Sequence, residues 1–278
     1  MADLSEKIVP ACRVCSNERA RVKYQISGYD VLECTKCDLQ FHTGTVESEK
    51  LYSEEYFSGD VYADYIGERD KRIKDFAGHV RTINDHVPSR GDLLEIGCAA
   101  GFFLKNAQDD GWRVKGVEVS HFAADYGRNE LGLDITRTDI DSLCLKPESY
   151  DAVVLWDVIE HLKDPFTVLK QVSSALRKNG CLFLTTGDIR GLNARIYGAK
   201  WYLYAPPHHI WYFSHQNMSR YVEQLGLVVE RCTGDGNLLN NNEQNFFTRY
   251  WLLKHWRVRE FLGKMHIGNS FFLVARKG

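Results

Sequence analysis

The feature that most constrains the fold is a run of twelve residues, from Leu93 to Leu104, in which an apolar strand leads into a turn of small residues and then a helix. Gly97, Ala99 and Gly101 carry little or no side chain, so the backbone of this turn can approach a ligand closely. The N-terminus of the following helix presents free N–H groups. The pattern therefore predicts a nucleotide-binding loop after a buried strand.

The residues of the loop also argue against one common alternative. A dinucleotide-binding fold makes the same turn, but its G-x-G-x-x-G pattern requires a glycine where this chain has Phe102. With an acid two residues before the first glycine, the stretch instead resembles motif I of class I S-adenosylmethionine (SAM) methyltransferases, E/D-x-G-x-G-x-G, with alanine in the middle position. The resemblance implies a SAM site whose loop is formed by Glu95, Gly97, Ala99, Gly101 and Phe102.

Two further acids follow in the order that this resemblance implies. The second strand ends near Glu118, 17 residues past Gly101, where a carboxylate can accept both ribose hydroxyls. Glu118 and the neighbouring Val119 are therefore expected at the ribose. Asp139 falls in the loop after a short third strand, and in similar proteins an acid there binds the adenine amine. The resemblance thus implies that Asp139 and Ile140 contact the base.

The fourth expected strand, residues 150–156, is followed by an Asp-x-x-Glu-His block. Ligands of open α/β sheets gather at the carboxyl ends of the strands, so Trp156 and Asp157 are expected beside the cofactor. If the block begins a helix, Asp157, Glu160 and His161 stand at i, i+3 and i+4 and share one face.

Three roles for this block remain open. His161 titrates near neutral pH and can be the general base that removes a proton from a substrate hydroxyl. Alternatively, Asp157, Glu160 and His161 hold a divalent cation such as Mg²⁺, which lowers the pKa of that hydroxyl. In the third interpretation, Asp157 and Glu160 form a capping box at the start of the helix.

The segments on the substrate side are the least regular. Residues 188–213 and the following Ser214 end in His-x-Trp-x-Phe-Ser, which resembles the segment beside the substrate pocket of small-molecule methyltransferases. That resemblance implies His208 and His209 as rival bases, unless one of them is only a packed histidine in an aromatic loop. The tyrosine-rich stretch before the nucleotide loop resembles a cap, in which Tyr56 or Tyr65 closes over the cofactor, reaches the substrate hydroxyl, or packs within the cap.

Four of the eight cysteines form two C-x2-C pairs, and the 18 residues between the pairs match the spacing of zinc sites. Two alternating runs around Ser27 and Gly28 predict a β-hairpin between the pairs. Four thiolates complete a tetrahedral shell and leave no open position, so the expected zinc ion is structural. The predicted ligands are Cys12, Cys15, Cys34 and Cys37.

Outside the segments described above, the sequence predicts alternating strands and helices. Helices are expected over Asp70–Asn84, Ala123–Asn129, from Asp164 to a stop at Asn179-Gly180, and from Ser214 to Gln224. Strands are expected at Arg113–Val119, Leu133–Thr136, Cys181–Thr186, Leu227–Arg231 and Ser270–Ala275. We therefore predict a doubly wound, seven-stranded, mostly parallel sheet of the Rossmann-like methyltransferase type. The expected domains are a zinc-ribbon module at 1–48, a helical cap at 49–88, and a SAM domain at 89–278 with insertions at 188–213 and 237–267.

Composition limits the classes of partner. A net charge of −2 gives no overall attraction to nucleic acid, so no nucleic-acid partner is expected. The chain start lacks a signal pattern and no apolar run approaches roughly 18 residues, which favours a cytoplasmic protein. The apolar, basic stretch at 246–262 is expected to form a lid or homodimer element, or to contact a membrane or a lipid-linked substrate.

The expected function is transfer of a methyl group from SAM to a hydroxyl of a small molecule or saccharide, with His161 as the favoured base. The Asp-x-x-Glu-His block is similar to that of ubiquinone-pathway O-methyltransferases, whereas the four-cysteine module and the tyrosine-rich cap resemble bacterial deoxysugar C-methyltransferases. Sugar C-methylation is therefore one alternative. An RNA-binding or scaffold protein with a vestigial SAM site is another.

Overall fold

The structure is a computed structural model and describes residues 6–44, 64–235 and 262–278. Tyr56, the stretch 246–261 and the expected module boundary at residue 48 therefore lie outside the described residues. The chain divides into two compact units. The first comprises Met1–Val46, Ile159–Lys163 and Leu184–Ala275, and the second comprises Glu47–Val158, Asp164–Phe183 and Arg276–Gly278.

The larger sheet confirms the predicted doubly wound, mostly parallel arrangement. Its seven strands run in the order β11-β12-β9-β8-β5-β6-β7. The parallel neighbours include β5 (Asp92–Ile96), β6 (Arg113–Glu118), β7 (Ile135–Arg137) and β8 (Tyr150–Trp156). The remaining strands are β9 (Leu176–Gly187), β11 (Leu227–Gly234) and β12 (Ser270–Lys277). Continuous apolar runs such as 152–155 in β8 are fully buried, as expected for the interior of a parallel sheet.

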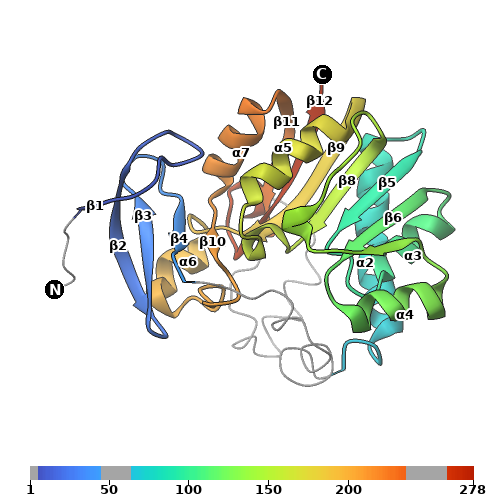
Figure 1. Ribbon diagram of the computed structural model, residues 1–278, viewed down its shortest axis with the longest axis horizontal. Helices are drawn as coiled ribbons and strands as arrows, with labels where there is room; N and C mark the ends of the chain where they lie inside the picture. The colour runs from blue at the N-terminus through green and yellow to red at the C-terminus, as the bar shows by residue number, and fades with distance from the viewer. Residues whose placement is uncertain (1–5, 45–63, 236–261) are drawn as a thin grey trace. The chain divides into compact units, whose positions relative to one another are not determined.

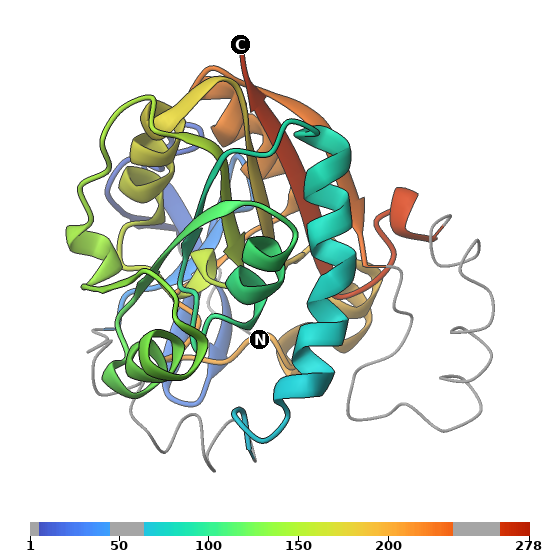
Figure 2. The same ribbon diagram turned by 90° about the vertical axis from the view of Figure 1, so that its right-hand side faces the viewer.

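The helices of the second unit are α2 (Arg69–His86), α3 (Phe102–Asp109), α4 (His121–Leu131) and α5 (Pro165–Ala175). Helix α2 lies beside α3 (Figure 2). Two side-chain hydrogen bonds hold it there: Asn106 donates to the carbonyl of Ile73 (2.6 Å), and the indole of Trp112 donates to Asn84 (3.0 Å). Among the described residues, none of the helices is long and apolar enough to span a lipid bilayer.

Local start signals cap three helices: α5 and α7 begin where the sequence predicts, whereas α4 begins two residues before the predicted Ala123. Ser120 caps α4, and its side chain accepts from the N–H of Ala123. Asp164 caps α5 immediately before Pro165, the first helical residue. In the first unit, α7 (His215–Gln224) begins with a capping box formed by Ser214 and an asparagine three residues later.

The predicted end of α5 is wrong. The helix ends at Ala175, and strand β9 begins at Leu176, before the Asn-Gly pair that was expected to stop the helix. Asn179 adopts a left-handed φ of 65°. A Cβ on Gly180 would lie 3.1 Å from the carbonyl oxygen of Tyr150. The glycine therefore serves the close approach of strand backbones and does not cap a helix.

The Asp-x-x-Glu-His block does not begin a helix. Asp157 has a φ of 53°, and the chain then makes only a 3-10 turn, η3 (Ile159–His161). An N-cap residue adopts extended backbone, so a left-handed Asp157 does not cap a helix. The capping-box interpretation and the shared helical face both fail for this reason.

The first unit contains a five-stranded sheet in the order β1-β2-β3-β4-β10 (Figure 1). Strands β2 (Arg19–Ile26) and β3 (Tyr29–Cys34) form the predicted hairpin, which turns through Ser27 and Gly28, both with positive φ. Short strands β1 (Glu6–Ile8) and β4 (Gln40–His42) flank the hairpin and pair antiparallel with it.

The segment 188–213 is more regular than the sequence indicated. It contains α6 (Leu192–Tyr197), the 3-10 turn η4 (Gly198–Lys200) and strand β10 (Trp211–Tyr212), which pairs antiparallel with β4. The segment therefore completes the N-terminal sheet. Side chains from the hairpin and from this segment share a buried core formed by Val31, Ile189, Ala194, Trp201, Tyr204 and Tyr212.

Candidate functional site

The nucleotide loop runs from β5 into α3 and depends on left-handed backbone. Gly97 and Gly101 have φ values of 71° and 81°, and Ala99 adopts 46°. A Cβ on Gly97 would also lie 2.5 Å from a methyl group of Val158, closer than a real contact allows. Glycine is therefore required at this position for both conformation and space. The loop forms the cradle of small residues that close approach to a cofactor needs.

Glu118 at the end of β6 fixes this loop. Its Oε2 accepts from the N–H of Ala99 (2.8 Å), and its Oε1 accepts from the N–H groups of Val119 (2.9 Å) and Ser120 (2.8 Å). The side chain is 5% exposed, and burial raises its pKa although the three hydrogen bonds oppose that shift. A carboxylate offers about four lone-pair positions, so roughly one on Oε2 is left for a ligand.

Glu95 in β5 is a buried acid whose bonding is incomplete. The side chain is 3% exposed, and its Oε2 has no hydrogen-bond partner among the described residues. Burial, with the nearby charge of Glu118, raises the pKa of Glu95 well above 4.5. A buried orphan acceptor beside a glycine loop suits a ligand that brings a positive charge or a donor. SAM carries both an ammonium and a sulfonium, so these residues fit the cofactor.

Aromatic side chains surround the start of α3. Tyr65 stacks on Phe102 with ring centroids 5.5 Å apart, and the guanidinium of Arg72 lies 4.0 Å from the centre of the Tyr65 ring. Trp156, at the end of β8, contacts Phe103 (5.5 Å) and His79 (4.7 Å) edge-to-face. Tyr65, one of the two predicted cap tyrosines, therefore packs against the loop itself.

Asp139 has a local role in addition to its predicted one. Its Oδ1 accepts from the N–H of Asp141 (3.1 Å) and caps the short 3-10 turn η2 (Ile140–Ser142). Ile140 is buried. The structure thus shows how Asp139 is oriented, and its contact with the adenine stays a prediction.

In the first unit, two histidines that are far apart in sequence come together. One candidate ligand atom from each of Glu160, His161 and His209 lies within 4.8 Å of the others. The imidazole rings of His161 and His209, hereafter the histidine pair, meet edge-to-face with centroids 4.6 Å apart. The backbone carbonyl of Glu160 accepts from the N–H of Ile210 (2.8 Å), which ties η3 to the start of β10. His209, and not Asp157, is the third member of this cluster.

The tautomer of each ring follows from its partner. Nδ1 of His161 lies 2.9 Å from the carbonyl oxygen of His208, and Nδ1 of His209 lies 2.7 Å from that of Leu203. A carbonyl can only accept, so both Nδ1 atoms carry the proton and both Nε2 atoms have a lone pair. Burial lowers the pKa of His161 well below 6.5 and that of His209 to about 4. Both rings are therefore neutral at pH 7.

The four predicted zinc ligands also come together in the first unit. The sulfur atoms of Cys12 and Cys37 are 3.5 Å apart, and those of Cys15 and Cys34 are 3.6 Å apart. Zinc–sulfur bonds of about 2.3 Å in a tetrahedron would place the sulfurs about 3.8 Å from one another. The hydrogen bond between Cys12 and Cys37 lowers the pKa of Cys12 and raises that of Cys37, so these two sulfurs share one proton. The cluster fits a closed, structural zinc site.

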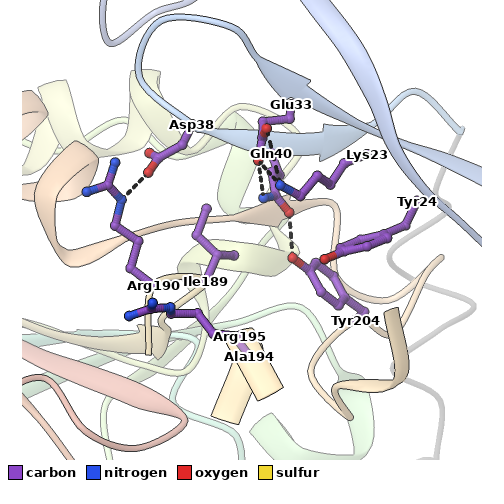
Figure 3. Close-up of a pocket in the computed structure, with 10 residues that line it drawn as sticks. All are labelled: Lys23, Tyr24, Glu33, Asp38, Gln40, Ile189, Arg190, Ala194, Arg195 and Tyr204. Atoms are coloured by element: carbon purple, nitrogen blue, oxygen red, sulfur yellow. Dashed lines mark hydrogen bonds and ion pairs between the residues drawn. The ribbon is translucent and has the colours of Figure 1, made fainter. Parts of the chain in front are cut away.

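A polar cavity of about 500 Å³ lies in the same unit, between the hairpin strands and residues 189–204 (Figure 3). Glu33 accepts from Gln40 (2.9 Å), and the hydroxyl of Tyr204 donates to the other end of that glutamine (2.6 Å). Arg190 pairs with Asp38 at another side of the cavity. The lining comes from β2, β3, β4 and α6 as well as from loops, so no local sequence pattern marks the cavity.

Comparison with known sequences agrees with this geometry. The sequence model of the family described as "Methyltransferase domain" matches residues 68–232. The chain is 30% identical over 157 residues to a protein named ubiquinone biosynthesis O-methyltransferase from Parvibaculum lavamentivorans, covering 51% of this chain and 60% of that one. A protein of the same name from Marinobacter nauticus is 26% identical over 167 residues, covering 55% and 70%. The match thus spans well under the full length of these curated relatives.

Solved structures share the fold. A SAM-dependent methyltransferase from Archaeoglobus fulgidus matches with a TM-score of 0.55 and 17% identity, covering 77% of this chain and 99% of that one. One from Mesorhizobium loti matches with a TM-score of 0.54 and 17% identity, covering 72% and 96%. At these identities the likeness establishes the Rossmann-like methyltransferase fold alone.

Proposed function

The chain belongs to the family of methyltransferase domains, and on that premise we propose that it transfers a methyl group from SAM to a hydroxyl of a small molecule or saccharide. The observation that carries this proposal is the histidine pair, whose Nδ1 atoms both donate to backbone carbonyls. That arrangement presents two neutral imidazoles whose Nε2 atoms carry no proton. A neutral imidazole can accept a proton from a hydroxyl, and burial, which lowers the pKa of His161, keeps the ring in this form at neutral pH.

His161 is the proposed general base. It follows β8 by five residues, and chemistry in open α/β sheets gathers beyond the carboxyl ends of the strands. Its Nε2 would accept the hydroxyl proton as the acceptor oxygen bonds to the methyl carbon, while the methyl–sulfur bond breaks and S-adenosylhomocysteine leaves. The carbonyl of His208 then stabilises the imidazolium through the Nδ1–H bond, in the way an orienting acceptor does in other acid–base sites. His209 keeps the ring of His161 in place through the edge-to-face contact.

The nucleotide loop is the proposed cofactor site. When bound, SAM supplies a methyl group activated by a positively charged sulfur. Gly97 and Gly101 allow the backbone to approach it closely, and Glu95 provides a buried acceptor for its positive charge. Because three N–H groups already bind Glu118, we expect this residue to bind one ribose hydroxyl, where the sequence alone predicted two.

A hydrophilic acceptor suits the polar cavity of Figure 3. Glu33, Gln40 and Tyr204 form a fixed hydrogen-bond chain along its wall, and Arg195 adds a cation. Leu203, whose carbonyl orients His209, is the neighbour of Tyr204 in sequence. The cavity volume of about 500 Å³ falls within the range of small-molecule sites. These features support a saccharide or another polar hydroxyl compound as acceptor.

A metal-assisted version of the same reaction is the second candidate. Metal-binding histidines usually donate their other ring nitrogen to a carbonyl or carboxylate, which both members of the histidine pair do. Glu160, His161 and His209 would then hold a divalent cation that acidifies the acceptor hydroxyl. Turnover that survives EDTA treatment supports the base. Turnover lost to EDTA and restored by Mg²⁺ supports the metal.

The acceptor can be found by a direct screen. Radiolabelled SAM is incubated with phenols, nucleotide sugars and glycan fragments, and label transfer is counted for the wild-type protein and for His161→Gln. The proposal predicts transfer to a hydroxyl compound that requires His161. Transfer to a carbon or nitrogen atom, identified by mass spectrometry of the product, would overturn the hydroxyl assignment.

The four cysteines are proposed to hold one structural zinc ion. Four thiols that lie about 3.5 Å apart in two pairs, with no room in a tetrahedral shell for a water ligand, support a closed site. Such an ion contributes to folding and takes no part in methyl transfer.

A further inference from the structure

A second group of metal-binding side chains lies in the first unit, away from the four cysteines in sequence. Asp188 directly follows β9, His215 is the first residue of α7, and His266 precedes β12. One candidate ligand atom from each lies within 4.8 Å of the others. The carboxylate is 1% exposed, so it is a charge that the interior must compensate.

The two oxygens of Asp188 have different surroundings. Oδ1 accepts from the backbone N–H of Arg190 (2.9 Å) and, more weakly, from that of His215 (3.4 Å). Oδ2 faces both imidazoles: it lies 2.8 Å from Nδ1 of His215 and 3.9 Å from Nδ1 of His266. The backbone therefore orients the carboxylate, and one oxygen is presented to two ring nitrogens.

His266 is left with incomplete bonding in this arrangement. Its Nδ1 is buried and has no hydrogen-bond partner among the described residues. Its ring stacks on that of His215, with centroids 3.6 Å apart and planes 12° from parallel. A buried unpaired nitrogen is unfavourable, and only one of the two imidazoles is within hydrogen-bond distance of Oδ2. A cation between the three atoms would bind both nitrogens and the oxygen at once.

The distances suit such an ion. Zinc bonds of about 2.0 to 2.1 Å to nitrogen and oxygen, at tetrahedral angles, place neighbouring ligand atoms about 3.3 Å apart. The two nitrogen–oxygen distances, 2.8 Å and 3.9 Å, lie on either side of that value. Small rotations of the two rings would equalise them. Two histidines and one carboxylate are also a common ligand set for divalent transition metals.

We propose that Asp188, His215 and His266 form a second metal site, which binds zinc or a similar divalent transition metal with a water molecule as fourth ligand. The surrounding backbone holds the three segments in place. The side-chain oxygen of Asn269 accepts a hydrogen bond from the indole N–H of Trp201 (2.9 Å). The backbone carbonyl of Asn269 accepts a hydrogen bond from the backbone N–H of Asp188 (2.8 Å). The ion would fix the residues that precede β12 to the end of β9 and the start of α7.

Metal content tests the proposal directly. The full chain is loaded with excess zinc chloride and dialysed against metal-free buffer, and bound zinc is counted by mass spectrometry. We expect about two zinc ions per wild-type chain and one fewer in His266→Ala and in Asp188→Asn. His121→Ala is the matched control, because His121 is exposed at the start of another helix, and it should keep the wild-type count.

Cobalt distinguishes the two sites. Cobalt bound by four thiolates gives an intense sulfur-to-metal charge-transfer band, which an ion bound by nitrogen and oxygen lacks. We expect His266→Ala to lose one cobalt ion with no change in that band. An unchanged zinc count in both variants overturns the proposal, as does a lost band in a His266→Ala protein whose circular dichroism is unaltered. If the wild-type chain holds one zinc ion and His266→Ala holds none, the result supports this site and excludes zinc at the four cysteines.

Discussion

The nucleotide loop and the histidine pair position their functional groups in different ways. In the loop, contiguous residues from β5 to α3 shape the backbone, and the carboxylate of Glu118 binds three N–H groups of the loop and strand end. In the histidine pair, the residues are 48 positions apart, and carbonyls of the loop between η4 and β10 orient the two rings. The cofactor affinity of the loop should therefore depend on backbone conformation, whereas the chemistry of the histidine pair should depend on the protonation and packing of the two rings.

Because of this difference, changes in the pair should affect chemistry, and changes in the loop should affect cofactor affinity. We expect His161→Gln to lower kcat by about 10²- to 10⁴-fold with the acceptor found in the radiolabel screen, the range for loss of a general base. The Kd for SAM should change less than twofold, as measured by calorimetry. His121→Gln, on an exposed histidine, is the control. A kcat within threefold of wild type would remove His161 as base.

The pair should also give the protein a pH dependence that the loop does not. The pKa of His209 is about 4 in the folded chain and about 6.5 when unfolded, so the unfolded state binds more protons between these values. Stability is thus fully present above pH 6.5 and is lost as pH falls toward 4. For one such group the loss between pH 8 and pH 5 is about 2 kcal/mol.

Urea unfolding at a series of pH values measures this effect. His209→Gln lacks the titrating ring, so its free energy of unfolding should fall by about 2 kcal/mol less than that of wild type over the same interval. The substitution also changes packing, which shifts the free energy of unfolding at every pH. The test therefore compares how steeply that free energy falls with pH in the two proteins. Parallel curves for the two proteins would show that His209 is not a buried neutral ring.

In the loop, Gly97→Ala should weaken SAM binding by about 10- to 100-fold, because alanine is strained at a φ of 71° and its Cβ would overlap Val158. Gly132→Ala is the matched control: its φ is 66°, but no atom lies within 4 Å of the added Cβ. That variant should lose some stability and keep its SAM affinity. Equal losses of affinity in both would mean that the crowding at Gly97 is irrelevant.

The smallest expected effect is that of Glu118→Gln. The amide replaces one acceptor oxygen by a donor, which leaves at least one N–H group of the loop without its partner. We expect the Kd for SAM to rise by about 10-fold, the scale of one hydrogen bond to a charged group. Glu130→Gln, at an exposed glutamate of α4, is the control. An unchanged Kd would exclude Glu118 from the cofactor site.

The two regions also differed in how well they could be predicted. The loop is a local pattern: strand, small residues and helix follow one another, so residue order alone indicated the turn and the acid after it. Asp164 and Ser214 marked helix starts for the same reason. The Asn-Gly pair at 179–180 was misleading, because the same dipeptide that ends helices also allows strands to approach closely.

The contacts of the histidine pair required tertiary structure. The sequence proposed His161 and His209 as rivals, but their contact depends on a 3-10 turn after Asp157 and on the pairing of β10 with β4. Strand β10 has only two residues, too few for a periodic pattern. The cavity and the group at Asp188, His215 and His266 were not predicted, because their residues come from segments that no local rule connects.

The most direct test of the account is calorimetry of SAM and S-adenosylhomocysteine on the purified, zinc-loaded chain. The glycine loop and the buried Glu95 predict micromolar binding of both ligands, weakened in Gly97→Ala and unchanged in Gly132→Ala. Absence of binding by the folded wild-type protein would contradict the assignment of the loop as a SAM site and, with it, the proposed methyl transfer.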